Sequence, residues 1–282
     1  MQQDSDQGNH ETQFPKTSFV GTMQLAKGPP GPVPITKEKD LSVSSRNQDT
    51  KLVLFDMDGT LINIGYAHRE AVRIAVRTVY GLDIEGELDP QTHQGNTQLN
   101  IMRAIGRGMG LSPEVVEAHL TEAVKVQAET SIAILDDDLR TAILPGVVPL
   151  LETLQKGGHA LGLVTGTVSA ITSVVLERTG LQRYFPVYAC GDEGSERVDL
   201  LHLAINRAAH TYGFEPGRNG LVVVGDAVRD IQAGKALGAR VVAVATGAHP
   251  LDALLQHDPD VALPDFKDLR VALDAILGDS EE

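Results

Sequence analysis

Two carboxylates, Asp56 and Asp58, stand two residues apart directly after the apolar run of residues 52–55. At the end of a buried strand such carboxylates repel one another, and they are costly unless a cation or hydrogen bonds compensate their charge. Mg²⁺ is the natural compensation, because it prefers hard oxygen ligands and tolerates a site with only a few protein carboxylates. The pair therefore predicts a magnesium site after the first strand.

A second pair of acids follows a later apolar run, residues 221–224. Asp226 stands at the tip of this run, and Asp230 lies about one helical turn further along the chain. Because the carboxyl ends of parallel strands meet at one edge of a sheet, we expect the two pairs of acids to converge on one point.

A hydroxyl and a glycine follow another apolar run, residues 160–164. Thr165 offers its hydroxyl, and the N–H of Gly166 can approach an oxyanion closely because no side chain intervenes. Arg197, between the third and the fourth apolar runs, is the candidate cation for a bound phosphate. These three residues predict an anion site beside the carboxylates.

The strands that must position these groups are expected at short, continuous apolar runs, which are typical of strands buried on both faces. The runs are residues 52–55, 160–164, 187–190, 221–224 and 241–244, with a short sixth run at 261–263. Helical patterns closed by glycine lie between them, at residues 147–156, 168–178, 200–212 and 230–237. Such alternation predicts an α/β fold with a doubly wound, mostly parallel sheet.

The alternation is interrupted once, between about residues 65 and 143, where the pattern is helical throughout. Residues 66–80 carry apolar positions at helical spacing, and Ser112, Pro113 and Glu114 are typical of the start of a helix. Ligands in open α/β sheets bind beyond the carboxyl ends of the strands. A helical insert after the first strand is therefore expected to lie over the site as a lid.

The composition excludes several classes of protein. Lys and Arg number 24 against 38 Asp and Glu, a net charge of −14, whereas nucleic-acid-binding proteins carry clustered Lys and Arg. No apolar run approaches the roughly 18 residues needed to span a bilayer. The single cysteine, Cys190, cannot form a bridge within the chain, which fits a reducing compartment. We expect a cytoplasmic protein that binds neither nucleic acid nor membrane.

Taken in order, these motifs resemble those of the haloacid dehalogenase superfamily. They are Asp56 and Asp58 within Asp-Met-Asp-Gly-Thr, then Thr165, Arg197 and Asp226, each at or near the end of an apolar run. The resemblance covers about residues 51–275, and the helical insert stands where that superfamily places a cap. It implies an α/β core of residues 51–64 and 143–282 and a helical cap of residues 65–142. Residues 1–50, which are poor in apolar residues and hold four prolines between positions 29 and 34, are expected to be a disordered tail.

The resemblance implies roles for the two leading acids. Asp56 would attack the substrate phosphorus and form an aspartyl phosphate. Asp58 would protonate the leaving oxygen and then take a proton from the hydrolytic water. The true dehalogenases of the superfamily replace the second acid, so the presence of Asp58 argues against dehalogenation.

The resemblance also implies the groups that would hold phosphate and metal. Thr165 and the Gly166 N–H would bind the transferring phosphoryl group, and Arg197 would compensate its charge, although Lys is commoner at that position. Mg²⁺ would be held by Asp56, the backbone carbonyl of Asp58 and Asp226, with Asp230 acting from behind them.

Cap residues are expected to select the substrate. His68 matches a histidine that faces the site in phosphomutase-like and some phosphatase relatives, and Thr97 belongs to a turn that resembles the cap turn of phosphoglycolate-phosphatase-like relatives. Both are candidate substrate contacts, but a histidine with a purely structural role in the cap is an equally good interpretation of His68.

The resulting hypothesis is a Mg²⁺-dependent phosphatase that hydrolyses a small phosphorylated metabolite, similar to phosphoglycolate phosphatases. A sugar phosphomutase similar to beta-phosphoglucomutase is the first alternative, because it would use the same core residues. A catalytically idle binding or regulatory protein is the second, although the intact acids argue against it. Neither the particular ester nor the oligomeric state follows from the sequence.

Overall fold

The computed structural model describes residues 50–86, 88, 94–215 and 220–278. Of the predicted disordered tail, residues 1–50, only Thr50 is among them, and the rest of that prediction lies outside the described residues. None of the helices in the described ranges is both long and apolar enough to cross a membrane.

Six parallel strands form one sheet in the order β3-β2-β1-β4-β5-β6. They are β1 (Leu52–Phe55), β2 (Ala160–Val164), β3 (Val187–Ala189), β4 (Leu221–Gly225), β5 (Arg240–Val244) and β6 (Val261–Leu263). Each strand agrees with a predicted apolar run to within one residue at either end. The predicted doubly wound sheet is therefore confirmed, and every pairing between these strands is parallel.

The strand order reverses between β1 and β4, which is where open α/β sheets bind their ligands. Phe55 pairs with Val224 across the two strands, so the residues that follow them begin at the same level of the sheet. The Asp56 N–H extends this pairing by donating to the carbonyl of Val224 at 2.9 Å. The topology thus delivers Asp56 and Asp226 to one crevice.

Helices cover both faces of the sheet. On one face lie α5 (Val147–Lys156), α6 (Ser169–Thr179) and α10 (Leu269–Leu277), and on the other α7 (Arg197–Tyr212) and α8 (Val228–Ala236). Short elements complete this part of the chain: η1 (Arg140–Ala142), η2 (Leu181–Tyr184) and α9 (Leu251–Leu255). The four helices predicted here are confirmed, with boundaries that move by up to three residues.

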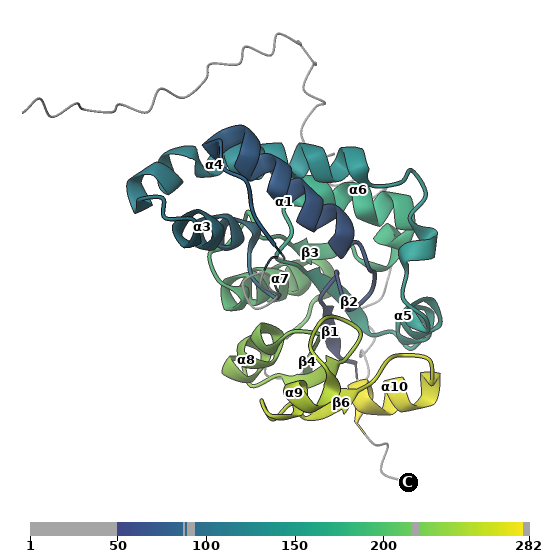
Figure 1. Cartoon of the computed structure of the whole chain (residues 1–282). Coiled ribbons are helices and arrows are strands. Elements are labelled where there is room, and N and C mark those ends of the chain that lie inside the picture. The colour runs from purple at the N-terminus through teal and green to yellow at the C-terminus, as the bar shows by residue number, and fades with distance from the viewer. Residues whose placement is uncertain (1–49, 87, 89–93, 216–219, 279–282) are drawn as a thin grey trace, which may run out of the picture. The chain divides into compact units, whose positions relative to one another are not determined.

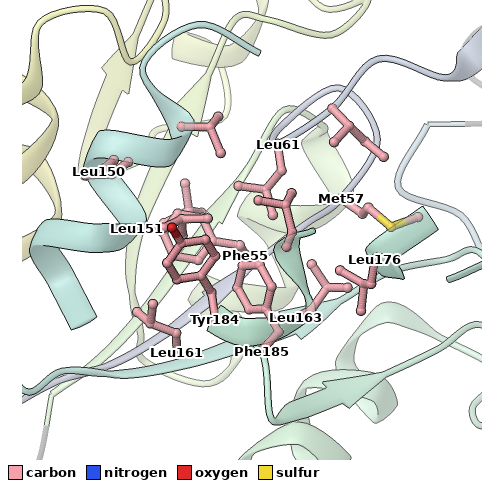
Figure 2. Packing of buried hydrophobic residues seen from close by; sticks show 14 of the residues in the cluster. Phe55, Met57, Leu61, Leu150, Leu151, Leu161, Leu163, Leu176, Tyr184 and Phe185 are labelled. Atoms are coloured by element: carbon pink, nitrogen blue, oxygen red, sulfur yellow. The ribbon is translucent and has the colours of Figure 1, made fainter. Parts of the chain in front are cut away.

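Alternate residues of β1 enter the two cores, as the pleat of a strand requires. Val53 and Phe55 belong to the cluster under α5, α6 and α10, whereas Leu52 and Leu54 belong to the cluster under α7 and α8. Figure 2 shows the first cluster, in which the ring of Phe55 meets that of Phe185 edge to face with centroids 6.2 Å apart. Packing on both faces fixes the strand that ends at Asp56.

The predicted helical insert consists, in the described residues, of α1 (Gly65–Tyr80), α3 (Gln98–Gly108) and α4 (Pro113–Ile134). α4 packs against both other helices, and the three share an apolar cluster that includes Val76, Met102 and Leu120. α4 begins as predicted, because the Ser112 hydroxyl accepts the N–H of Val115. Figure 1 shows these helices together, away from α8, α9 and α10.

The chain leaves and re-enters the α/β part through two segments that lie side by side. The Leu144 N–H donates to the Leu61 carbonyl at 2.9 Å, and the Asn63 N–H donates to the Ala142 carbonyl at 2.9 Å. Ile62 and Ile143 form an isolated antiparallel bridge. This paired connection ties the helical segment to the turn that carries Asp58.

The first prediction concerns the core that holds β1. Replacing the fully buried Leu150 of α5 by alanine leaves a cavity beside the sheet, and we expect it to lower the free energy of unfolding by about 2–5 kcal/mol. The matched control is Leu255→Ala, whose side chain is 55% exposed and which is expected to change the free energy by no more than about 0.5 kcal/mol. Urea denaturation measures both, and equal effects would contradict the assignment of the core.

Candidate active site

Three carboxylates meet beyond the ends of β1 and β4. Asp56 directly follows β1, Asp226 directly follows β4, and Asp230 lies in the first turn of α8. One oxygen of each lies within 4.8 Å of one oxygen of each of the others, and all three residues are buried. The structure therefore brings together three of the four acids that the sequence predicts to converge.

Asp226 is enclosed by two glycines. Its Oδ1 accepts the Thr60 hydroxyl at 3.2 Å. A Cβ on Gly59 would lie 2.5 Å from its Oδ2, and one on Gly247 only 1.7 Å away, so neither position admits a side chain in this arrangement. Gly59 also has a φ of +89°, which glycine adopts without steric cost. The backbone thus closes around this carboxylate.

Arg197 lies among the carboxylates and is buried. Its Nε donates to Oδ1 of Asp230 at 2.7 Å, and its Nη2 donates to Oδ1 of Asp56. The other oxygen of Asp230 accepts the N–H of Ala227 at 3.1 Å, so both of its oxygens are engaged. Nη1 of Arg197 is buried and has no hydrogen-bond partner in the described structure. One guanidinium thus joins the end of β1 to the start of α8.

The charges of this cluster do not balance, because one guanidinium faces three carboxylates. Burial, opposed by the charge of Arg197, raises the pKa of Asp56 from 3.8 to about 7, with Asp230 adding to the rise. Burial and the charges of Asp56 and Asp230 also raise the pKa of Asp226 well above its usual value. A divalent cation would relieve both effects, and carboxylate oxygens are the ligands that Mg²⁺ prefers. The donor set therefore fits the predicted ion.

The Asp58 side chain takes no part in this cluster but faces the same cavity. Its Oδ1 accepts the N–H of Ile64, the residue before α1, at 2.9 Å. The turn that carries it is held by the Leu61 N–H, which donates to the Met57 carbonyl at 2.9 Å. Asp58 therefore lies between the sheet and the helical segment, two residues from Asp56.

Thr165 and Gly166 follow β2 on the other side of Asp56. The Thr165 hydroxyl accepts the N–H of Thr167 at 3.1 Å, which fixes the turn after the strand. A Cβ on Gly166 would lie 1.9 Å from the carbonyl oxygen of Asn96, so the segment before α3 rests directly on this glycine. The Gln98 N–H donates to the Gly166 carbonyl at 2.9 Å. The predicted anion site and the helical segment are therefore in contact.

A cavity of about 380 Å³ lies over these groups. Its lining includes six of the predicted site residues, namely Asp56, Asp58, His68, Thr165, Gly166 and Asp226. Arg197 and Asp230 lie behind them and do not line it. His68 reaches the cavity from α1, its two ring nitrogens are buried without a partner in the described structure, and burial lowers its pKa.

Thr97 lies in the same segment but does not line the cavity. Its hydroxyl caps α3 by accepting the N–H of Asn100 at 3.4 Å. The same hydroxyl donates to the Ser195 carbonyl, also at 3.4 Å. Nδ2 of Asn100 donates to the same carbonyl at 2.8 Å. The structure thus places Thr97 where it anchors α3 to the loop before Arg197, whereas Gln98 faces the cavity.

Some cavity residues were not predicted from the sequence. Thr246 and Gly247 follow β5 and line the cavity, and the Thr246 hydroxyl donates to the Gly59 carbonyl at 2.6 Å. Their position directly after the apolar run of residues 241–244 was the available signal. Gln94 lines the cavity through a segment with no periodic pattern, so no sequence signal marked it.

Parallel strands with buried carboxylates where the strand order reverses define an open α/β protein with a candidate metal-binding active site at that point. A family model described as haloacid dehalogenase-like hydrolase matches residues 50–238. The chain therefore belongs to the haloacid dehalogenase-like hydrolase family. The phosphoglycolate phosphatase of Salmonella typhimurium is 28% identical over 251 residues, which cover 83% of this chain and 97% of the relative. The predicted family and the predicted enzyme class, a phosphoric monoester hydrolase, are confirmed.

Solved structures share the fold. A predicted phosphatase from Clostridium acetobutylicum superposes with a TM-score of 0.62 at 17% identity, covering 79% of this chain and 98% of that one. An inferred beta-phosphoglucomutase from Bacteroides vulgatus superposes with a TM-score of 0.60 at 22% identity, covering 80% of this chain and 88% of that one. At these identities the likeness supports the architecture, which is common to both.

The second prediction concerns how the stabilisation of the fold by Mg²⁺ depends on pH. A carboxyl pKa raised by folding means that the folded protein holds a proton that the unfolded chain has released, so this site lowers stability as the pH rises from about 4 to about 7. A bound cation replaces that proton. We therefore expect the increase in melting temperature caused by Mg²⁺ to be larger at about pH 8 than at about pH 5.

Differential scanning fluorimetry measures this increase. Asp226→Asn should abolish it, whereas Asp252→Asn, a change at an exposed aspartate of α9, should leave it intact. An increase that is the same at both pH values, or that survives Asp226→Asn, would contradict a metal site at these carboxylates.

Proposed function

We propose that the protein is a Mg²⁺-dependent phosphatase that hydrolyses a small phosphomonoester through an aspartyl phosphate on Asp56. The observation that carries this proposal is the buried cluster of Asp56, Asp226 and Asp230 around Arg197, of which Asp56 and Asp226 line a cavity that Asp58 also lines. The phosphoglycolate phosphatases among the relatives support a small phosphorylated substrate.

In the proposed first step, an Asp56 carboxylate oxygen forms a bond to the substrate phosphorus while the bond from phosphorus to the ester oxygen breaks. Asp58 donates a proton to that leaving oxygen, which departs as an alcohol. The Thr165 hydroxyl and the Gly166 N–H bind the equatorial oxygens of the phosphoryl group. Arg197 stabilises Asp56 in its ionised form, because its Nη2 donates to the carboxylate.

In the second step, water attacks the phosphorus of the aspartyl phosphate and the bond to the Asp56 oxygen breaks. Asp58, ionised by the first step, takes a proton from that water, and inorganic phosphate leaves. Asp56 returns to its carboxylate form. When bound, Mg²⁺ would be held by Asp56, the Asp58 carbonyl and Asp226, and it would supply compensation for the charge of the phosphoryl oxygens.

The helical segment, residues 65–142, is proposed to act as a cap on a core of residues 51–64 and 143–282. His68 and Gln98 reach the cavity from it, so the cap would contribute to substrate choice while the core performs the transfer. Phosphoglycolate is the favoured model substrate because of the relatives. A cytoplasmic location remains a prediction from the composition.

The third prediction tests the two acids. Asp56→Asn removes the nucleophile and should abolish Mg²⁺-dependent hydrolysis of an aryl phosphate. Asp58→Asn removes the proton donor and should lower kcat by about 10²–10⁴-fold. The exposed Asp136→Asn is the matched control and should keep the full rate. Turnover by Asp56→Asn at the normal rate would refute the proposed nucleophile.

The fourth prediction separates hydrolysis from phosphoryl return. A mutase similar to beta-phosphoglucomutase would convert a hexose 1-phosphate into the 6-phosphate, whereas a phosphatase releases only inorganic phosphate. We expect phosphorus NMR of the incubated hexose 1-phosphate to show no 6-phosphate, with inorganic phosphate as the sole phosphorus product of any turnover. Accumulation of the 6-phosphate would establish the mutase. Binding of the ester without any product, together with no turnover of the aryl phosphate, would favour an idle binding protein.

A further inference from the structure

One arginine in the cavity has no ion-pair partner among the described residues. α1 carries three arginines, of which Arg73 donates to the Ile84 carbonyl at 2.7 Å and Arg77 pairs with Asp83 at 2.5 Å. For Arg69, no hydrogen bond or ion pair is found among the described residues. Arg69 lines the cavity, and it is the only lysine or arginine among the described residues that do so.

The guanidinium of Arg69 lies over the first turn of α1, beside the catalytic acids. A Cβ on Gly65, the first residue of the helix, would lie 3.1 Å from Nη1 of Arg69 and 3.6 Å from Oδ2 of Asp58. The absence of a side chain at Gly65 therefore leaves the space in which the guanidinium approaches the site. Arg69 is also exposed, so its charge is solvated until a ligand covers it.

Apart from Asp58, the polar side chains that the helical segment places near Arg69 in the cavity are uncharged. His68 has two buried ring nitrogens without a partner in the described structure, and its pKa is lowered by burial, which favours the neutral imidazole. Nε2 of Gln98 is buried and lacks a partner among the described residues. These groups can hydrogen-bond to the body of a substrate, but they cannot neutralise a second charge on it. Among the described residues that line the cavity, Arg69 is the one whose positive charge can neutralise a second anionic group.

We propose that Arg69 is a specificity-determining residue that binds a second anionic group of the substrate, at the end remote from the transferring phosphoryl group. The proposal rests on the phosphatase function proposed above. The transferring phosphoryl group already has Thr165, Gly166 and the metal site, so an additional unpaired guanidinium at the cap side matches a second anion. A carboxylate or a second phosphate carries the negative charge that Arg69 would bind. A sugar monophosphate lacks it, because its sugar part is uncharged.

The discriminating ligands are a carboxylate and its neutral amide. For turnover these are 2-phosphoglycolate and the corresponding amide. Glucose 1,6-bisphosphate tests whether a phosphate can replace the carboxylate as the second anion. For binding they are 3-phosphonopropionate and its amide, whose carbon–phosphorus bond resists hydrolysis, measured by calorimetry on the full chain with Mg²⁺. The binding pair tests Arg69 whether or not the enzyme turns over either ester.

Arg69→Gln should weaken binding of the carboxylate phosphonate by about 10- to 100-fold, the range of a charged hydrogen bond, and leave that of the amide within about threefold. Arg69→Lys should recover part of the preference, because it restores the charge without the planar fork. Arg77→Gln is the matched control on the same helix and should change neither. In turnover, Arg69→Gln should raise KM for the anionic ester selectively.

Equal losses for the carboxylate and the amide would overturn the proposal, because Arg69 would then act on the phosphoryl group itself or on the fold. Unchanged binding of both phosphonates together with unchanged turnover of the bisphosphate would also overturn it. A selective loss with the bisphosphate alone would support it and identify the second anion as phosphate. Failure of Asp56→Asn to abolish turnover would instead refute the proposed function, and it would leave the binding result for Arg69 standing.

Discussion

Repulsion among Asp56, Asp226 and Asp230 is the constraint on which the site depends. All three are buried, and the single guanidinium of Arg197 cannot neutralise them. The fold forces this arrangement, because two strands buried on both faces end side by side. The backbone at Gly247 also packs directly against the Asp226 carboxylate. The stability that the two apolar cores provide offsets the cost of burying these charges together.

The helical segment is bound to the same loops that carry the chemistry. Gln98 bonds to Gly166, in the predicted anion site, and both Thr97 and Asn100 bond to Ser195, two residues before Arg197. A movement of α3 would therefore displace the turn after β2 and the loop before α7 together. This gives the helical segment a direct physical route to the proposed phosphoryl site, besides the residues that it contributes to the cavity.

The sequence was informative where one local property decides the structure. Short, continuous apolar runs between helical patterns are typical of strands buried on both faces, so all six strands and the positions of Asp56 and Asp226 could be predicted. Side-chain direction depends on packing between distant segments, and there the sequence was insufficient. Nothing local indicates that Arg197 joins Asp56 to Asp230, that Thr97 turns away from the cavity, or that Gly247 faces Asp226.

The central claim is that an Asp56 oxygen takes the phosphoryl group while a divalent ion offsets the surrounding charge. The most direct measurement is peptide mass spectrometry after rapid acid quenching of the enzyme with its phosphate ester, with and without Mg²⁺. We expect one added phosphoryl group on the peptide that contains Asp56, only when Mg²⁺ is present. A phosphoryl group on a different residue, or equal labelling with the metal chelated, would contradict it.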